Sequence, residues 1–335
     1  MAEKDWKNQL TQILDRLSLL EEKYEGLGQD MISYLDGLYY SNGLTYWDYI
    51  HLDSLLGLQT PRTPLKDEVI FITYHQITEL QFKLIKLELE RLIAPEGEEK
   101  PWLQLANWYK HLGRAINYFK HLSHSFDIML NGMDPEEFRK FRMALLPASG
   151  FQSVQIRHIE IMSPHLRQLT GLTDDTTESA TAESLYPHIY WKRGGIDLKT
   201  GEKTMTLKQF EGKYDRSLLR MIRTYETQNL AYLFEHLPQE MQQDKKLRQL
   251  LREYDQYVNV FWKLSHLSAA ARHLVTKGSD IDATGGTNWR SFLPPRYQKI
   301  IFFQSLWTSQ EIENWGREAV VRQFKDAVAN DWMGE

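Results

Sequence analysis

Cysteine is absent from the 335 residues of this sequence. Its absence excludes disulfides, zinc–cysteine clusters, iron–sulfur centres, thiolate catalysis and any haem held through a cysteine sulfur. Long apolar runs are lacking too, because no stretch approaches the roughly 20 residues that a membrane helix needs. The start Met1-Ala-Glu-Lys-Asp-Trp6 is too charged for the apolar centre of a signal peptide. We therefore expect a cytoplasmic protein with no membrane partner.

An excess of basic charge is also missing. The formal net charge is −5, the pI is near 6.2, and Lys and Arg are dispersed among acidic residues. Nucleic acid requires a cationic face, so no nucleic acid partner is expected. Ser/Gly-rich linkers, low-complexity tracts and internal repeats are lacking as well. These absences favour one domain over residues 1–335, with a small molecule as its partner.

Helical periodicity covers most of the sequence, whereas strand signals are scarce. Hydrophobic residues make up 42% and aromatic residues 12%, enough for a sizeable core with rings left to line a flat pocket. The predicted class is all-α, a helical bundle, in which ligand sites form between facing helices. The expected helices cover residues 4–24, 46–56, 67–93, 102–124, 135–145, 151–160, 218–236, 240–276 and 309–331. The expected connections are a tyrosine-rich segment at 34–40, a short hairpin at 190–203 and a loop at 277–287.

The helix expected from Asp67 to Ile93 is the most informative one. Phe71 and His75 are four residues apart on it and therefore share a face. An imidazole beside an aromatic wall suits the recognition of a flat ligand that carries one N–H group. The alternative is a core histidine whose ring nitrogen bonds a backbone carbonyl.

Metal-binding patterns indicate no site with several protein ligands. The paired Glu-x-x-His motifs of di-iron bundles are absent, and so is His-Glu-x-x-His. A haem needs only one axial histidine. His266 is a candidate, because small residues near it would let a flat macrocycle approach the helix backbone; the alternative is ordinary close packing of helices. These small residues are Ser265, Ser268, Ala269 and Ala270.

Two further segments and one loop carry groups suited to a polar ligand. Phe138 and Arg142 again lie four residues apart, and a guanidinium can bind a carboxylate through two N–H groups, although surface ion pairing is the usual alternative. The helix break at residues 146–153 exposes N–H groups that suit an anion. The loop at Thr284-Gly-Gly either folds over a substrate or only turns the chain.

In this order, these segments resemble the tryptophan 2,3-dioxygenase family over residues 44–290. Four regions of the sequence carry the resemblance. They are Tyr46-Trp-Asp-Tyr49-Ile-His-Leu-Asp53-Ser-Leu-Leu56, Glu68-Val-Ile-Phe71-Ile-Thr-Tyr-His75-Gln76 with Glu79-Leu-Gln-Phe-Lys83, Phe141-Arg142 through Leu145-Leu-Pro-Ala-Ser149-Gly150-Phe-Gln-Ser-Val-Gln155-Ile-Arg157, and Trp262, His266, Arg272, Lys277 and Thr284-Gly-Gly.

The resemblance implies a helical homotetramer that holds haem b and uses O2 to open the indole ring of L-tryptophan, giving N-formylkynurenine in the kynurenine pathway of tryptophan catabolism. By position, His266 would be the axial iron ligand with Trp262 beside it. His75 would accept the indole N–H, and Arg142 would clamp the carboxylate. The other expected contacts are Phe71, Phe138 and Leu145 as walls, Thr284 at the polar end of the substrate, Ser149 and Gly150 at the haem edge, Arg157 near a propionate, and Tyr46, Tyr49 and Ile50 in the pocket of a neighbouring subunit.

The resemblance also implies how the single domain is organised. Residues 1–45 would form a helical arm for contacts between subunits, and residues 46–164 the half that holds the substrate. Residues 165–215 would be an irregular insertion. Residues 216–335 would form the half that carries the iron ligand.

The sequence departs from the family pattern in three places. Gln81 stands where a tryptophan is expected, Phe138 stands where bacterial members commonly have tyrosine, and the interval from His266 to Thr284 is longer than usual. Two other hypotheses therefore remain beside the dioxygenase. One is a haem monooxygenase or peroxygenase of another aromatic amino acid or substituted tryptophan, and the other is a haem-free helical interaction protein.

Overall fold

A computed structural model of the whole chain describes residues 2–41, 43–94, 100–172, 180–197, 200–276, 279–280, 295 and 299–323. The chain divides into two compact units, Met1–Gln59 and Thr60–Glu335. Among the described residues, no helix combines the length and the apolar character that crossing a bilayer requires.

The first unit consists of helices. Its elements are α1 (Ala2–Glu25), α2 (Met31–Tyr40), α3 (Tyr46–Tyr49) and α4 (Leu52–Leu56). The expected tyrosine-rich connection was wrong, because Asp30 caps α2 by accepting hydrogen bonds from the N–H groups of Ile32 and Ser33. The helix expected over 46–56 is two short helices, since His51 between them adopts a left-handed φ of 53°.

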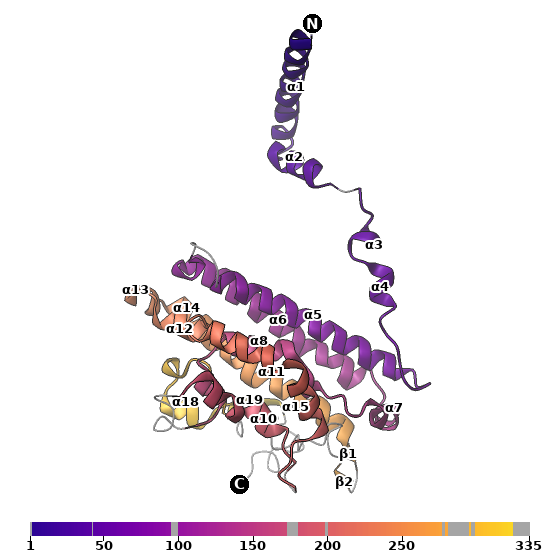
Figure 1. Cartoon of the computed structure of the whole chain (residues 1–335), viewed down its shortest axis with the longest axis vertical. Helices are drawn as coiled ribbons and strands as arrows, with labels where there is room; N and C mark the ends of the chain where they lie inside the picture. The colour runs from indigo at the N-terminus through magenta and orange to yellow at the C-terminus, as the bar shows by residue number, and fades with distance from the viewer. Residues whose placement is uncertain are drawn as a thin grey trace. The chain divides into compact units, whose positions relative to one another are not determined.

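Two long helices dominate the second unit, α5 (Asp67–Ile93) and α6 (Leu105–Asn131), and they pack side by side (Figure 1). α8 (Val154–Met162) packs against α5, while α14 (Lys245–Gln256), the π-helical turn η7 (Tyr257–Phe261) and α15 (Trp262–Leu274) pack against α6. In the described part of the chain, β1 (Val275–Thr276) and β2 (Ser279–Asp280) form the single strand pair. The all-α prediction is confirmed.

The remaining elements of the second unit are short, with one exception. They are η1 (Pro101–Leu103), α7 (Pro135–Phe141), η2 (Arg142–Leu145), η3 (Gly150–Gln152), η4 (Leu166–Leu169), α9 (Ala182–Leu185), η6 (Tyr186–His188), α10 (Tyr190–Gly194), α11 (Met205–Tyr225), α12 (Leu230–Glu235), α13 (Gln239–Gln242), η8 (Gln304–Leu306), α18 (Ser309–Glu313) and α19 (Arg317–Gln323).

Several expected helix boundaries were wrong, and side-chain caps account for two of them. α11 begins at Met205 rather than near 218, because the Thr204 hydroxyl accepts from the Leu207 N–H. The helix expected over 240–276 is interrupted, since Asp244 caps a new helix start at α14. The expected hairpin reduces to one antiparallel bridge between Ile196 and Lys203.

The apolar core of the second unit lies chiefly along α5 and α6. Ile85 and Leu89 on α5 and Trp108, Leu112 and Phe119 on α6 are fully buried. Each such side chain stabilises the fold by about 1.5–3 kcal/mol relative to an exposed position. The core therefore fixes α5, one of the helices that carries a predicted site residue.

Asp255 fastens the segment near residue 302 to α14. It is fully buried, and its carboxylate accepts hydrogen bonds from the N–H groups of Phe302 (3.1 Å) and Phe303 (3.2 Å), the Trp307 indole (3.1 Å) and the Asn259 amide (2.8 Å). Burial raises the pKa of Asp255 to about 6, and the four N–H donors oppose that rise. One carboxylate thus ties three parts of the chain together.

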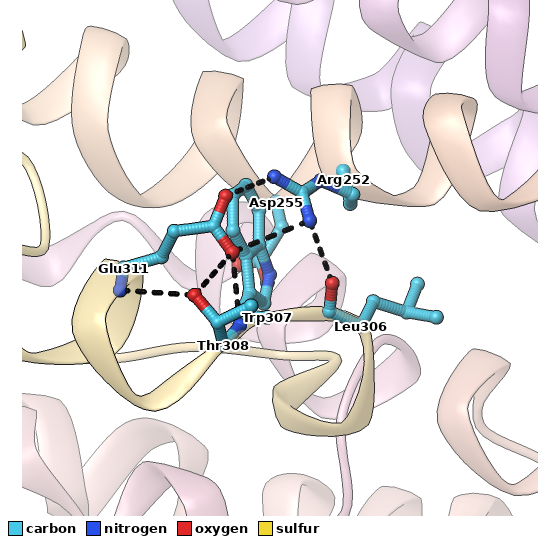
Figure 2. A network of polar contacts seen from close by, with 6 residues as sticks. All are labelled: Arg252, Asp255, Leu306, Trp307, Thr308 and Glu311. Atoms are coloured by element: carbon cyan, nitrogen blue, oxygen red, sulfur yellow. Dashed lines mark hydrogen bonds and ion pairs between the residues drawn. The ribbon is translucent and has the colours of Figure 1, made fainter.

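A second, more exposed group of contacts lies beside Asp255 (Figure 2). Arg252 donates to the Leu306 carbonyl at 2.7 Å and forms an ion pair with Glu311. Glu311 also accepts from the N–H of Thr308 at 2.9 Å and so completes a capping box at the start of α18. These contacts hold the same segment from its solvent side.

We predict that Asp255→Asn destabilises the protein, because the new amide places donors against donors. Each N–H left without an acceptor should cost roughly 1–3 kcal/mol, measured by urea unfolding. Glu311→Gln is the control, since both members of that ion pair are more than a third exposed and exposed pairs contribute at most about 1 kcal/mol. Equal losses in the two variants would contradict this account of Asp255.

Candidate functional site

A cavity of about 610 Å³ lies between α5 and α15. Its volume is within the range of about 300–1,000 Å³ that is typical of sites for small molecules and cofactors. The wall combines many apolar side chains with a few polar groups. Its lining includes Phe71, Tyr74, His75, Glu79 and Phe82 of α5, Phe126 and Met129 of α6, Phe138, Leu145, Ser149 and Gly150 from residues 135–152, Arg157 and Glu160 of α8, Tyr190 and Trp191 of α10, and Trp262, Lys263, His266, Ala269, Ala270 and His273 of α15.

The pairs of residues that meet across the cavity show that α5 and α15 run in opposite directions. At one end the rings of Phe82 and Trp262 lie 5.3 Å apart. At the other end the Phe138 ring lies 5.9 Å from that of Phe71 and 4.9 Å from that of His273. His75 and His266 therefore lie between the two ends, on opposite helices.

His75 has one ring nitrogen engaged and one available. Its Nδ1 lies 2.7 Å from the Phe71 carbonyl oxygen, so Nδ1–H donates and Nε2 carries no proton. Burial lowers the pKa of His75, which keeps the ring neutral at pH 7. The two sequence interpretations of His75 are thus compatible, because the carbonyl satisfies one nitrogen and leaves the other as an acceptor beside the Phe71 ring, 4.1 Å away.

His266 lies deep in the protein, yet its side chain is exposed because it borders the cavity. Among the described residues, neither of its ring nitrogens has a hydrogen-bond partner. Burial, helped by the nearby His75, lowers the pKa of His266 to about 4. A neutral imidazole is the form that binds a metal ion. No group of three or more His, Asp or Glu side chains suited to a metal occurs in the part of the chain that the structure describes.

A buried ion pair lines part of the cavity. Arg157 donates to Glu160 at 3.0 Å and to the Tyr190 hydroxyl at 2.9 Å, and that hydroxyl donates to Glu160. The Arg157 guanidinium also lies 5.0 Å from the Trp191 ring, where cation–π attraction favours it. Burial and the neighbouring Glu160 raise the pKa of Tyr190, which therefore stays protonated. The network ties α8 to α10.

The structure brings together most of the residues predicted from sequence. Nine of them line the cavity, namely Phe71, His75, Phe138, Leu145, Ser149, Gly150, Arg157, Trp262 and His266. Arg142 is buried in η2 but does not border the cavity. Thr284 lies outside the described residues. Tyr46, Tyr49 and Ile50 belong to the first compact unit, so their contact with a neighbouring subunit stays a prediction.

Sequence reasoning missed several residues that line the cavity. Tyr190 and Trp191 come from α10, whose five residues are too few to show a helical period. Glu160 was seen only as part of a helix. The sequence could have predicted that Lys263 lines the cavity, because Lys263 precedes His266 by three residues and so shares its helix face. His273, two turns beyond His266, could have been found in the same way.

Comparisons with known proteins relate this sequence to one family. The sequence profile of the family described as tryptophan 2,3-dioxygenase matches residues 37–282, a range that includes both helices bordering the cavity. The tryptophan 2,3-dioxygenase of Polaromonas naphthalenivorans is 28% identical over 281 residues, which are 80% of this chain and 91% of that protein. That of Bordetella parapertussis is 27% identical over 300 residues, 85% of this chain and 96% of that protein. Tryptophan 2,3-dioxygenase 2 of Ralstonia nicotianae is 41% identical over 126 residues, 36% of this chain and 34% of that protein.

We predict that Arg157→Met destabilises the protein by about 3–5 kcal/mol, because it leaves the carboxylate of Glu160 buried without its cation. Denaturant unfolding of the purified variant measures this loss. The double variant Arg157→Met/Glu160→Gln should recover part of it, since the uncompensated charge is gone. A double variant less stable than the single one would show that the ion pair is not the source of the effect.

Proposed function

The chain belongs to the tryptophan 2,3-dioxygenase family, and on that premise we propose that it is a haem-dependent oxidoreductase that inserts both atoms of O2 across the indole C2–C3 bond of L-tryptophan, giving N-formylkynurenine. One observation carries the proposal more than any other. His75 and His266 border the same cavity from opposite helices, one with a nitrogen able to accept a hydrogen bond and the other with no partner among the described residues.

The residues of the cavity fit a haem. His266 presents a neutral imidazole to hold the iron, and Ala269 and Ala270, one turn further along α15, leave space beside it. The wall includes flat apolar rings such as Phe82 and Trp262, which suit the faces of a macrocycle. Lys263 supplies positive charge at one end of the cavity, which suits the carboxylates of the macrocycle. When bound, ferrous haem supplies the activation of O2.

The side chains of the cavity would fix one orientation of the substrate. His75 Nε2 would accept the indole N–H, while Nδ1 keeps its proton for the Phe71 carbonyl. Phe71, Phe138 and Leu145 would form apolar walls that exclude water and hold the indole plane. Fixing the ring in this way contributes to catalysis through proximity and orientation. His75 therefore acts as an orienting acceptor in this proposal.

The contacts proposed for the carboxylate and ammonium groups of the substrate are predictions from the sequence. Arg142 remains the proposed group for the carboxylate, since it lies in η2 between Phe138 and Leu145, which both line the cavity. Thr284 keeps its proposed role at the same end.

The proposal also includes a homotetramer, in which Tyr46, Tyr49 and Ile50 reach a neighbouring subunit. It includes a cytoplasmic location as well. The family membership supports both.

We predict that reduced, haem-loaded protein converts L-tryptophan and O2 into N-formylkynurenine, followed by its ultraviolet absorbance and by product mass. A mass gain of two oxygen atoms is the expected result. A product with one added oxygen would favour the monooxygenase hypothesis and overturn this one. A protein that shows no Soret band after haem supplementation would favour the haem-free interaction protein.

A second prediction concerns His266. His266→Ala should lose the Soret band of bound haem, and added imidazole should restore part of it by filling the space left beside the iron. His121→Ala is the control, because His121 is an exposed histidine on α6. If His266→Ala binds haem with an unchanged spectrum, His266 is not the axial ligand.

A further inference from the structure

Lys263 is a buried cation that borders the cavity and has no ion-pair partner among the described residues. Its residue is only 9% exposed, and it lies on α15 among the lining residues. Within the described part of the chain, no carboxylate oxygen lies within 4.0 Å of its Nζ. Its polar contact is the Asn259 side-chain oxygen at 3.5 Å, the upper limit of hydrogen-bond distance. A buried charge in this position is costly unless something else neutralises it.

The carboxylates near Lys263 are already engaged. Glu160 pairs with Arg157 and accepts from Tyr190. Asp255, two turns before Lys263 on the same helical face, accepts from the Asn259 amide that separates the two residues. The three donors of Lys263 therefore have one weak acceptor between them. The Tyr190 ring, 5.0 Å from Nζ, adds cation–π attraction but no negative charge.

Arg157 is less suited to an anionic ligand than its position suggests. Its guanidinium donates to Glu160, to Tyr190 and, at 3.4 Å, to the Phe151 carbonyl. Its charge is balanced within the protein by Glu160. An anion that bound Arg157 would have to compete with a buried carboxylate, whereas an anion that bound Lys263 would fill an open position.

The geometry points to Lys263, rather than Arg157, as the residue that binds a carboxylate of the tetrapyrrole in this cavity. Lys263 precedes His266 by three residues, so it lies on the same helix face about 4.5 Å along the axis. A macrocycle whose iron is held by His266 would therefore bring its rim past Lys263. Arg157 then acts as a positioning residue that keeps Tyr190 and Glu160 in place. This inference rests on the proposed function.

Titration of apo-protein with two probes tests the inference. The probes are iron protoporphyrin IX and its dimethyl ester, in which both carboxylates are capped, and the Soret band reports binding. The natural protein should bind the free acid more tightly than the ester. Lys263→Met should weaken binding of the free acid by roughly 10- to 100-fold, the range expected for a charge-assisted hydrogen bond in a desolvated site. It should leave binding of the ester nearly unchanged, and Lys263→Arg should restore the preference.

Heat stability of the apo-protein separates ligand binding from a structural role. Removing a buried cation that pairs with no described carboxylate should leave the melting temperature of apo Lys263→Met unchanged or higher. A structural lysine would give a lower one. Lys246→Met is the matched control, because Lys246 also lies over a tyrosine ring, that of Tyr109 at 4.2 Å, but is exposed on α14. It should change neither stability nor affinity appreciably.

The outcomes distinguish this inference from the proposed function. If the natural protein binds neither probe, the proposed haem enzyme is wrong. If it binds haem and Lys263→Met keeps the same preference for the free acid, the assignment of Lys263 is wrong and the haem enzyme stands. A fall in the melting temperature of the apo variant together with equal losses for both probes would also overturn the assignment, since Lys263 would then only support the fold.

Discussion

An open space between two packed helices persists only if other parts of the fold hold those helices apart. Here α6 packs against both α5 and α15, and the two helices leave a cavity of about 610 Å³ between them. The buried pair of Arg157 and Glu160 lines this cavity and stays together, because separating the two charges would leave each one buried without its partner. The positions of His75 on α5 and His266 on α15, which both border the cavity, follow from this spacing.

Burial gives the two central histidines their chemistry. It lowers the pKa of both His75 and His266, so both rings are neutral at pH 7. The difference between them comes from their partners. The Phe71 carbonyl fixes the tautomer of His75 and leaves an acceptor, whereas His266 keeps its ring free of hydrogen bonds among the described residues. One imidazole is thereby prepared for a substrate N–H and the other for a metal.

The charged end of the cavity shows how an apolar site accommodates an anionic group. Arg157, whose charge Glu160 balances, stabilises the structure there, and Lys263, which has no carboxylate partner among the described residues, would provide affinity. Hydrogen bonds connect Lys263 to Asn259, Asn259 to Asp255, and Asp255 to the backbone of Phe302. They link the charged end of the cavity to the segment near Phe302. Arg252 and Asp255 of Figure 2 belong to α14, which continues through η7 into α15, the helix that carries Lys263.

Sequence alone predicted the parts of this account that rest on regular, local patterns. The bounds predicted for α5 agree with the structure, because acidic residues open the helix in the sequence and Pro95-Glu-Gly97 follows its end. The shared face of Phe71 and His75 followed from helical spacing. Short elements such as α10 carry no period, and the pairing of Arg157 with Tyr190 joins residues far apart in sequence, so neither could be read from the chain. That no described carboxylate pairs with Lys263 is likewise a property of the folded protein only.

The central claim is that a single iron centre lies between α5 and α15. Anomalous diffraction at the iron absorption edge, from crystals of the haem-reconstituted protein, locates that iron directly. The account predicts one iron peak at bonding distance from a ring nitrogen of His266, on the side that faces His75. An iron bound to any other side chain, or on the far side of α15 from His75, would contradict it.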